Sequence, residues 1–420
     1  MRRLITLLAA MLMVNFVGFT GFAIAGTEIT LIMPSHEADV LGYFEKKAGE
    51  YERQTGIKVN IVTADWTHVA DKVLVALASG SSAYDIVEFD NCWVAQFAET
   101  EWLRPLETYT TAEEYIKGML PGLVKVFSAK GHLYGITWNN DVRLFMYNAR
   151  MLKQAGIGAP PATWGELVEQ SRRLQAAGIA KYGLIQGWER HGNLMDDHTV
   201  MVRDFGGRIL DENKNPVLDS PEAVAALQFM VDMFRKDKII DPTSLTSSLK
   251  VIQEVFLRGD TAFFPQAWPG VYTNSRDPKL SRVVGEVEPA SKPLEGPGKK
   301  SVLMCVPEAL AIPTASKHPD EAWDFIKFIT SKENNKAQCA SIGTLPIWTD
   351  LFNDPELLRK YPQWKQFGLQ SRYLEGRVVV SWWNELWEIE EVEVTNALMG
   401  LKTVEQATRD MMKKLKAIEK

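Results

Sequence analysis

The order of hydrophobic and polar positions predicts an alternation of strands and helices in the N-terminal part of the chain. Alternating hydrophobic residues predict strands at residues 28–33, 57–63 and 85–89, and helical spacing predicts helices at 41–51 and 69–77 between them. Strands joined through single helices form a parallel sheet with right-handed crossovers. Such sheets bind ligands beyond the carboxyl ends of their strands.

Polar and aromatic residues follow each of these three predicted strands. The first strand is followed by Ser35, His36 and Glu37, the second by Asp65 and Trp66, and the third by Asp90 and Trp93. Each loop alone is a weak signal, because turns are polar and a single Trp is more often a core residue. The three loops together predict a ligand site at one edge of the sheet.

A second region begins after Pro160 and Pro161. Thr163 with Glu166 predicts a capped helix through residue 177, and Ser220 followed by proline predicts the start of another. A predicted strand at residues 182–185 leads into further polar and aromatic residues, which are Gln186 and Trp188.

Three later features complete the expected organisation. The run FFPQAWPG predicts a loop fixed by two prolines that presents Gln266 and Trp268. A short strand at 309–313 and a helix at 322–329 follow a Gly/Pro-rich run. After Pro346 the pattern predicts helix to the C-terminus, and the last long helical region opens with Trp382, Trp383 and Trp387.

The length of 420 residues predicts two domains, and the hydrophobic and charged fractions of 46% and 24% are those of a globular protein. The net charge of -6 argues against a nucleic-acid partner, since phosphate binding needs a basic face.

The first 25 residues have the pattern of a secretory signal. Arg2 and Arg3 precede an apolar stretch, and Ala23 and Ala25 form the small-residue ending of a cleavage site. An uncleaved membrane anchor is the alternative reading. The residue directly after Ala25 is Gly26 and not a cysteine, so we expect an exported periplasmic protein without a lipoprotein anchor.

The usual catalytic and cofactor motifs are missing. The chain has no zinc-protease helix, phosphate-binding loop, nucleophile elbow or dinucleotide fingerprint, so we expect no enzymatic activity, cofactor or metal. The acidic pairs Asp196–Asp197 and Glu390–Glu391 are expected on solvated faces. Three distant cysteines leave at least one thiol unpaired, and pairing of Cys305 with Cys339 stays open.

Thirteen tryptophans are the unusual feature of the composition. Sugars stack their C–H faces on aromatic rings, and their hydroxyls need donors and acceptors in fixed geometry. Indoles near Asp, Asn and Gln in loops therefore favour carbohydrate binding. Four indoles on helix faces or beside caps are expected in the core instead: Trp102, Trp164, Trp323 and Trp364.

Four separated segments carry a resemblance to a known family. The runs DIVEFDNCWVAQFAETEWLRPLE, KGHLYGITWNNDVRLFMYNARMLKQAGIGAPPATWGELVE, NPVLDSPEAVAALQFMVDMF and EALAIPTASKHPDEAWDFIKFITSKENN resemble the extracellular solute-binding proteins of family 1, which are maltose-binding-protein-like sugar receptors of ABC transporters. The resemblance implies an α/β periplasmic binding protein type II fold, in which two lobes are joined by crossing strands. It places these crossings near residues 138–143, 285–289 and 344–348.

The resemblance also implies where ligand residues lie. The first and third loops contribute Ser35, His36, Glu37, Asp90 and Trp93, the crossing strand contributes Asn140 and Asp141, and the second lobe contributes Gln186, Trp188 and Trp268. The family's late aromatic falls on Trp387, and which of Trp382, Trp383 and Trp387 faces the cleft stays open. Trp66 and Trp138 are core or cleft residues, and Arg190 is a ligand clamp or a surface ion pair.

The sequence thus predicts a signal peptide at 1–25, an N-terminal lobe at 26–139 and 288–345, and a C-terminal lobe at 140–287 and 346–420. We expect a monomeric receptor that captures a mono- or oligosaccharide and delivers it to the inner-membrane permease subunits of an ABC transporter. A receptor for a polyol, a glycerol phosphate or another polar solute is one alternative. A secreted glycoside hydrolase is another.

Overall fold

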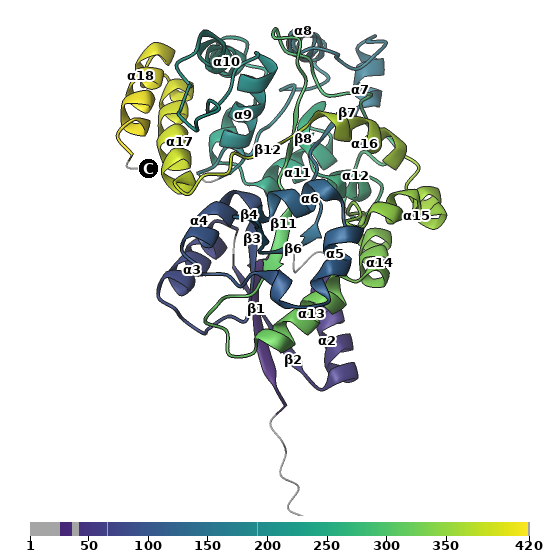
Figure 1. Cartoon of the computed structure of the whole chain (residues 1–420). Coiled ribbons are helices and arrows are strands. Elements are labelled where there is room, and N and C mark those ends of the chain that lie inside the picture. Colours follow the sequence, from purple (N-terminus) through teal and green to yellow (C-terminus); the bar gives the residue numbers. More distant parts are fainter. Residues whose placement is uncertain (1–25, 36–41, 65, 191, 419–420) are drawn as a thin grey trace, which may run out of the picture.

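The computed structural model describes residues 26–35, 42–64, 66–190 and 192–418, so the predicted signal segment lies outside the described residues. Figure 1 shows two parts, one above the other, each built around its own sheet. We call the lower part, with the five-stranded sheet, the N-terminal lobe, and the upper part, with a three-stranded sheet, the C-terminal lobe.

The five-stranded sheet has the order β2-β1-β3-β11-β6. Strands β1, β2 and β3 are parallel, and β11 is antiparallel to both β3 and β6. Two helices connect the first three strands, so the predicted β-α-β-α-β unit is confirmed. The bounds are β1 Glu28–Pro34, α2 Tyr43–Thr55, β2 Lys58–Ala64, α3 Trp66–Ala78, β3 Ile86–Asp90, β6 Ile136–Asn139 and β11 Glu308–Ala311.

Helices cover this sheet, and their buried faces follow the predicted hydrophobic spacing. Helix α13 (Pro319–Thr330) buries Phe325, Ile326 and Ile329, as the sequence predicts. Tyr51 of α2 packs on Phe325 with ring centroids 5.2 Å apart. The remaining elements of this lobe are α4 Val94–Glu99, α5 Ala112–Gly118, α6 Pro121–Val126, β4 Ser128–Ala129, β5 His132–Leu133 and α14 Lys332–Ile342.

The C-terminal lobe contains the antiparallel sheet β8-β7-β9, formed by Phe263–Ala267, Leu144–Asn148 and Val287–Pro289. The prediction of a proline-fixed loop at 263–270 is wrong in its first half, because the residues of β8 are a buried strand. Pro265 is accommodated because β8 is an edge strand whose pairing with β7 is irregular between Leu144 and Met146. The predicted strand at 182–185 is reduced to bridges at Leu184.

Helices surround the second sheet and begin at the predicted caps. The Thr163 hydroxyl accepts the backbone N–H of Glu166, and the Ser220 hydroxyl accepts that of Ala223. The helices are α7 Ala149–Gln154, α8 Trp164–Ala176, α9 Leu194–Asp204, α10 Pro221–Val231, α11 Leu249–Arg258 and α12 Pro269–Ser275.

The region after Pro346 is helical for most of its length, but the prediction of helix to the C-terminus is wrong at residues 374–380, and turns separate the helices elsewhere. Strand β12 (Leu374–Gly376) pairs in parallel with β10 (Leu303–Cys305), and no helix includes residues 377–380. The β-branched run Val378–Val380 explains the break, because such side chains favour extended backbone. The helices are α15 Pro355–Lys360, α16 Trp364–Gln370, α17 Trp383–Met399 and α18 Val404–Leu415.

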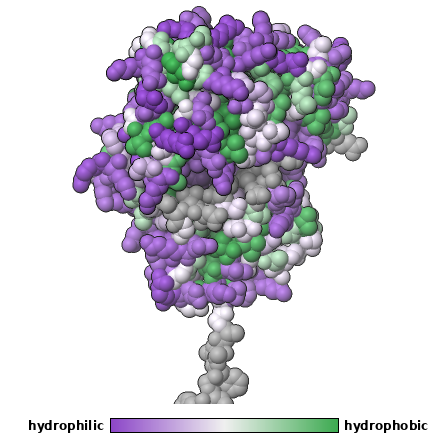
Figure 2. All heavy atoms as spheres, turned by 180° about the vertical axis from the view of Figure 1, so that it is seen from behind, coloured by the Kyte–Doolittle hydropathy of each residue, from purple (hydrophilic) through white to green (hydrophobic). Residues whose placement is uncertain are grey.

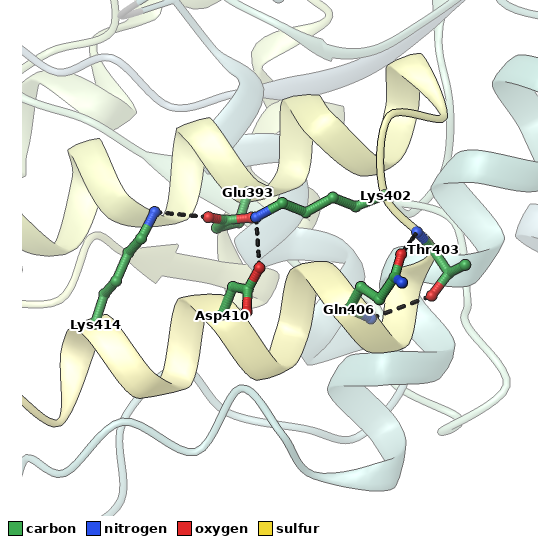
Figure 3. Close-up of polar contacts among 6 residues, drawn as sticks. All are labelled: Glu393, Lys402, Thr403, Gln406, Asp410 and Lys414. Atoms are coloured by element: carbon green, nitrogen blue, oxygen red, sulfur yellow. Dashed lines mark hydrogen bonds and ion pairs between the residues drawn. The ribbon is translucent and has the colours of Figure 1, made fainter.

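A buried carboxylate joins the last two helices. The side chain of Glu393 on α17 is fully buried and accepts hydrogen bonds from Lys402 and Lys414, each at 2.7 Å (Figure 3). Lys402 also contacts Asp410 of α18 at 2.6 Å. We call these four residues the hairpin cluster, because they fasten two helices that are consecutive in the chain.

Three segments of the chain lie side by side where the lobes meet, and they contain residues 140–143, 304–306 and 345–346. The first runs from the end of β6 to the start of β7, and it is bridged to Leu345 at Asn140 and to Cys305 at Val142. Because β9 still belongs to the second sheet and β11 to the first, the chain returns to the N-terminal lobe after Pro289. The domain bounds given above remain a prediction.

The described surface is mostly hydrophilic when seen from behind, with hydrophobic residues in separate places (Figure 2). The large exposed hydrophobic residues, such as Val75, Leu280 and Leu401, come from different elements. Within the described ranges, no helix has the length and apolar character needed to cross a bilayer.

Candidate functional site

The carboxyl end of β3 places polar groups at the boundary between the lobes. Asp90 ends the strand and is 3% exposed, and burial raises the pKa of its carboxyl above the usual value although Arg377 opposes the shift. The indole N–H of Trp93 donates to the side-chain oxygen of Asn384 on α17 at 3.1 Å. Asp90 and Trp93 therefore both contact residues that follow in the last part of the chain.

The segment between β6 and β7 carries an ion pair of its own. A nitrogen of Arg143 lies 2.9 Å from a carboxylate oxygen of Asp141, and both side chains are buried. The guanidinium carbon of Arg143 lies 5.5 Å from the ring centroid of Trp268. Desolvation raises the pKa of Asp141, and the charge of Arg143 opposes this rise. Asn140 donates to the backbone oxygen of Pro346 at 2.9 Å.

Arg377 bridges the two lobes through two carboxylates. Its guanidinium donates to Asp90 of the N-terminal lobe, and to both oxygens of Asp196 on α9 at 2.8 and 2.7 Å. All three side chains are 5% exposed or less. We call these three residues the interlobe cluster. A paired, forked contact of this kind is among the stronger hydrogen-bonding geometries in proteins.

The face of α9 beside this cluster is acidic and buried. Asp197 accepts the indole N–H of Trp188 at 2.7 Å and the side-chain amide of Gln186 at 3.1 Å. Burial raises the pKa of Asp197 to about 7, even though the Trp188 hydrogen bond favours the ionised form. The expectation that Asp196 and Asp197 lie on a solvated face is wrong, because Trp188, Gln186 and Arg377 provide the partners that make burial possible.

The second acidic pair is also buried, which corrects its expected exposure. Glu390 and Glu391 on α17 are 3% and 5% exposed. An oxygen of Glu390 lies 2.6 Å from Nδ1 of His198 on α9. The Glu390 carboxylate therefore connects α17 with α9.

The late tryptophans lie at the start of α17. Trp383 and Trp387 contact edge to face, with ring centroids 5.2 Å apart. The guanidinium carbon of Arg377 lies 5.1 Å from the Trp387 ring centroid, and the Trp387 N–H has no hydrogen-bond partner among the described residues. Trp382 precedes the helix at its N-cap. Trp387 thus contacts the interlobe cluster.

The other predicted site residues are more dispersed. Trp138 packs edge to face on Phe44 at 4.8 Å in the N-terminal lobe, and Gln266 accepts the backbone N–H of Met304 at 3.1 Å. Ser35 is half-buried at the end of β1, whereas His36, Glu37 and Asp65 lie outside the described residues. Trp66 is the first residue of α3, and the structure does not describe its side chain.

Exposure decides the role left open for Arg190 and tests the four tryptophans expected in the core. Arg190 is 70% exposed and pairs with the half-exposed Glu388 at 2.7 Å, which is the geometry of a surface ion pair. The tryptophans expected in the core pack there: Trp164, Trp323 and Trp364 are buried, and Trp102 is partly buried against the core.

The boundary between the lobes is closed in this structure. Arg377 donates to Asp90 and Trp93 donates to Asn384 across this boundary, and the side chains of Arg377 and Asp90 are 4% and 3% exposed. A sugar can therefore reach Asp90 and Arg377 only if the lobes move apart at these contacts.

The described residues contain no group of three or more His, Cys, Asp or Glu side chains arranged to hold a metal ion. Cys92, Cys305 and Cys339 are all free thiols, so Cys305 does not pair with Cys339. Burial raises the pKa of Cys305 to about 12, which keeps this thiol protonated near neutral pH.

Sequence reasoning missed the two arginines that organise the boundary. Arg143 stands two residues after Asp141 and so lies on the same side of an extended segment, which was a usable signal. Arg377 lies in a stretch expected to be helical, where only the β-branched run at 378–380 indicated otherwise. Asp196 was seen as one of a pair but was expected on the surface.

Comparison with known families gives one match that covers most of the chain. Residues 35–336 match the family described as bacterial extracellular solute-binding protein. A probable ABC transporter-binding protein of Deinococcus radiodurans is 26% identical over 326 residues, which are 76% of each chain.

Solved structures show the same fold. The maltose-bound MalE3 protein of T. maritima has a TM-score of 0.85 and 28% identity, covering 93% of this chain and 99% of its own. An ABC transporter solute-binding protein of Thermotoga lettingae bound with alpha-D-tagatose has a TM-score of 0.83 and 22% identity, covering 93% of this chain and 100% of its own. The expected type II periplasmic binding protein fold is confirmed.

Proposed function

From the premise that this chain belongs to the bacterial extracellular solute-binding proteins, we propose that it captures a mono- or oligosaccharide between its lobes and delivers it to the permease of an ABC importer. The likeness to a maltose-bound protein at 28% identity supports a carbohydrate ligand.

The observation that carries this proposal is the meeting of indoles and charged polar groups at the lobe boundary. Asp90 and Trp93 come from the N-terminal lobe, Asp141 from the segment between the sheets, and Trp268 and Trp387 from the C-terminal lobe. Stacking surfaces beside fixed donors and acceptors are what a sugar requires. These residues, together with the other predicted site residues, are our proposed ligand-binding set.

Ligand entry requires opening, and the connections between the lobes permit it. The lobes are joined by short segments at the boundary, which can serve as a hinge. A ligand that contacts both lobes binds the closed form more tightly, and this difference shifts the population toward closure. Small-angle scattering should show a larger radius of gyration for the free protein than for the sugar complex.

A binding screen tests the function itself. Calorimetry and thermal unfolding with maltose, tagatose, ribitol and common hexoses should identify one ligand that binds with one equivalent. At 100 times its dissociation constant, this ligand should add about 2.7 kcal/mol to stability. Failure of every sugar and sugar alcohol to bind would exclude the proposed function.

We further propose that the protein binds its ligand without altering it. The carboxylates Asp90 and Asp196, which are buried at the boundary, are engaged by Arg377 and so are poorly placed for acid–base chemistry. Chromatography of the released ligand should recover it unchanged. Formation of new reducing ends would favour the hydrolase alternative instead.

Export to the periplasm is the expected setting for this function. The segment at 1–25 should be removed after Ala25, and the new N-terminal residue would be Gly26 and not a lipid-carrying cysteine. Intact mass of the periplasmic protein should equal that of residues 26–420, and light scattering should give a monomer. Recovery of the full-length chain from membranes would contradict cleavage.

A further inference from the structure

Asp141 and Arg143 hold two polar atoms that the fold leaves unused. Oδ1 of Asp141 and Nη1 of Arg143 are buried and have no hydrogen-bond partner among the described residues. The two residues are 7% and 5% exposed. An unsatisfied polar atom in the interior is costly, and each such atom in a native structure calls for an explanation.

The two atoms belong to one donor–acceptor unit. Asp141 and Arg143 contact each other at 2.9 Å through Oδ2 and Nη2, so each side chain retains one unused atom beside this contact. The carboxylate oxygen can only accept a hydrogen bond, and the guanidinium nitrogen can only donate one. A partner for both must therefore offer a donor and an acceptor on neighbouring atoms.

The backbone and a neighbouring ring fix the position of this unit. The Arg143 N–H donates to the Met304 carbonyl at 2.8 Å, and the Asp141 carbonyl accepts from Val306 at 2.9 Å. Arg143 precedes β7 and Trp268 follows β8, next to the paired residues Leu144 and Ala267. The ring of Trp268 therefore lies beside the guanidinium, as the 5.5 Å contact shows.

We infer that Asp141 and Arg143 form a subsite for two adjacent hydroxyls of an uncharged sugar or sugar alcohol, with one hydroxyl donating to Oδ1 of Asp141 and its neighbour accepting from Nη1 of Arg143. The inference rests on the proposed function and names the chemistry that this site recognises. It adds Arg143 to the proposed ligand-binding set, and in this subsite the ring of Trp268 orients the guanidinium of Arg143.

The surrounding charges favour an uncharged ligand. Three carboxylates, those of Asp90, Asp141 and Asp196, share the boundary with the two guanidinium groups of Arg143 and Arg377. When all five groups are ionised, three negative and two positive charges leave one negative charge. A phosphorylated or acidic sugar would add like charge in a desolvated place, which is unfavourable.

The ligand side of the subsite is tested with deoxy analogues. Calorimetry with maltose, tagatose and ribitol identifies the compound that binds most tightly, and its monodeoxy analogues are then compared. Removal of either of two adjacent hydroxyls should weaken binding about 10-fold or more, as expected for a hydrogen bond to a charged group. Glycerol 3-phosphate should bind far more weakly than the parent compound.

The protein side is tested with Arg143→Lys, which keeps the positive charge beside Asp141 but loses the forked donor. This variant should lose about 10-fold in affinity, and the analogue lacking the hydroxyl bound by Nη1 should then lose nothing further. Arg150→Lys is the matched control, because Arg150 on α7 is half-exposed and pairs with Glu286 at 2.7 Å. It should bind like the wild type.

The outcomes separate the two proposals. If the wild type binds none of these uncharged compounds, the proposed function fails and the subsite fails with it. If the wild type binds but all monodeoxy analogues bind equally, or Arg143→Lys keeps full affinity, only the subsite is overturned. Binding of glycerol 3-phosphate as tight as that of the parent compound overturns the assignment of an uncharged ligand.

Discussion

Two clusters in this protein have opposite charges at their centres and different surroundings. In the interlobe cluster, the cation Arg377 is held between Asp90 and Asp196, which are 287 and 181 residues away in the sequence. In the hairpin cluster, the anion Glu393 is held between Lys402 and Lys414, which are 9 and 21 residues away (Figure 3).

Exposure distinguishes the clusters further. Every member of the interlobe cluster is 5% exposed or less, whereas the lysines of the hairpin cluster are 27% and 49% exposed. The long lysine side chains keep their charged ends near water, so an ammonium group that leaves Glu393 becomes hydrated at little cost in free energy. The buried guanidinium of Arg377 cannot turn toward water in this way in the closed protein. The comparison therefore separates a local helix clamp from a contact that must respond when the lobes move.

Removal of the central cation should have the largest effect. Arg377→Gln leaves Asp90 and Asp196 buried without a positive partner, and loss of one member of a buried ion pair costs about 3–5 kcal/mol. Urea unfolding should show this loss in the free energy of unfolding, unless the lobes open and water reaches the carboxylates. In that case the radius of gyration of the free protein should increase.

Lys414→Gln in the hairpin cluster is the matched control for this prediction. It removes a half-exposed cation and should cost less than about 1 kcal/mol without a change in the radius of gyration. If Arg377→Gln is as mild as Lys414→Gln in both measurements, the distinction between the two clusters is wrong.

The pH dependence of stability should have opposite signs in the two regions. Burial raises the pKa of Asp197 from 3.8 to about 7, so the folded state holds its proton more tightly than the unfolded state. The stability from this group is present below pH 4 and is lost as pH rises toward 7. A shift of this size is worth a few kcal/mol, at about 1.4 kcal/mol per unit.

In the hairpin cluster the sign is reversed. Burial tends to raise the pKa of Glu393, but hydrogen bonds from Lys402 and Lys414 outweigh it and lower the pKa. The stability that the ionised Glu393 carboxylate contributes is therefore present at pH values above its ordinary pKa, and it is lost as pH falls. Unfolding of Asp197→Asn and the wild type between pH 4 and 8 should show a weaker loss on the alkaline side for the variant. Identical curves would contradict this assignment.

The comparison also shows why the sequence predicts the fold better than the site. Hydrophobic spacing is local, and it predicted the strands around residues 28–89 and the helix that contains Phe325, because each pattern repeats within one element. The interlobe cluster depends on residues far apart in the chain. No local pattern links Asp90 to Arg377, and the burial of Asp196 follows from a helix packing that only the folded chain contains.

A substitution near the lobe boundary should also weaken ligand binding, which a substitution in the hairpin cluster should not. Trp268 lies beside Arg143 and packs edge to face on Phe264 at 5.6 Å. Trp268→Ala should weaken sugar binding by about 1–3 kcal/mol, since a large apolar surface and the support of Arg143 are both lost. Calorimetry measures the change, and the melting temperature of the free protein serves as the control. Unchanged affinity would make Trp268 a packing residue only.

The smallest effect is expected from the centre of the hairpin cluster. Glu393→Gln keeps the size of the side chain and removes its charge, while Lys402 retains Asp410 as a partner at 2.6 Å. Because both lysines can turn toward water, we expect a loss of about 1 kcal/mol in the free energy of unfolding. Sugar affinity should stay within twofold of the wild type, since no member of this cluster bridges the lobes. A clear loss of affinity would mean that helices α17 and α18 transmit strain to Trp387 at the other end of α17, and the hairpin cluster would then belong with the site.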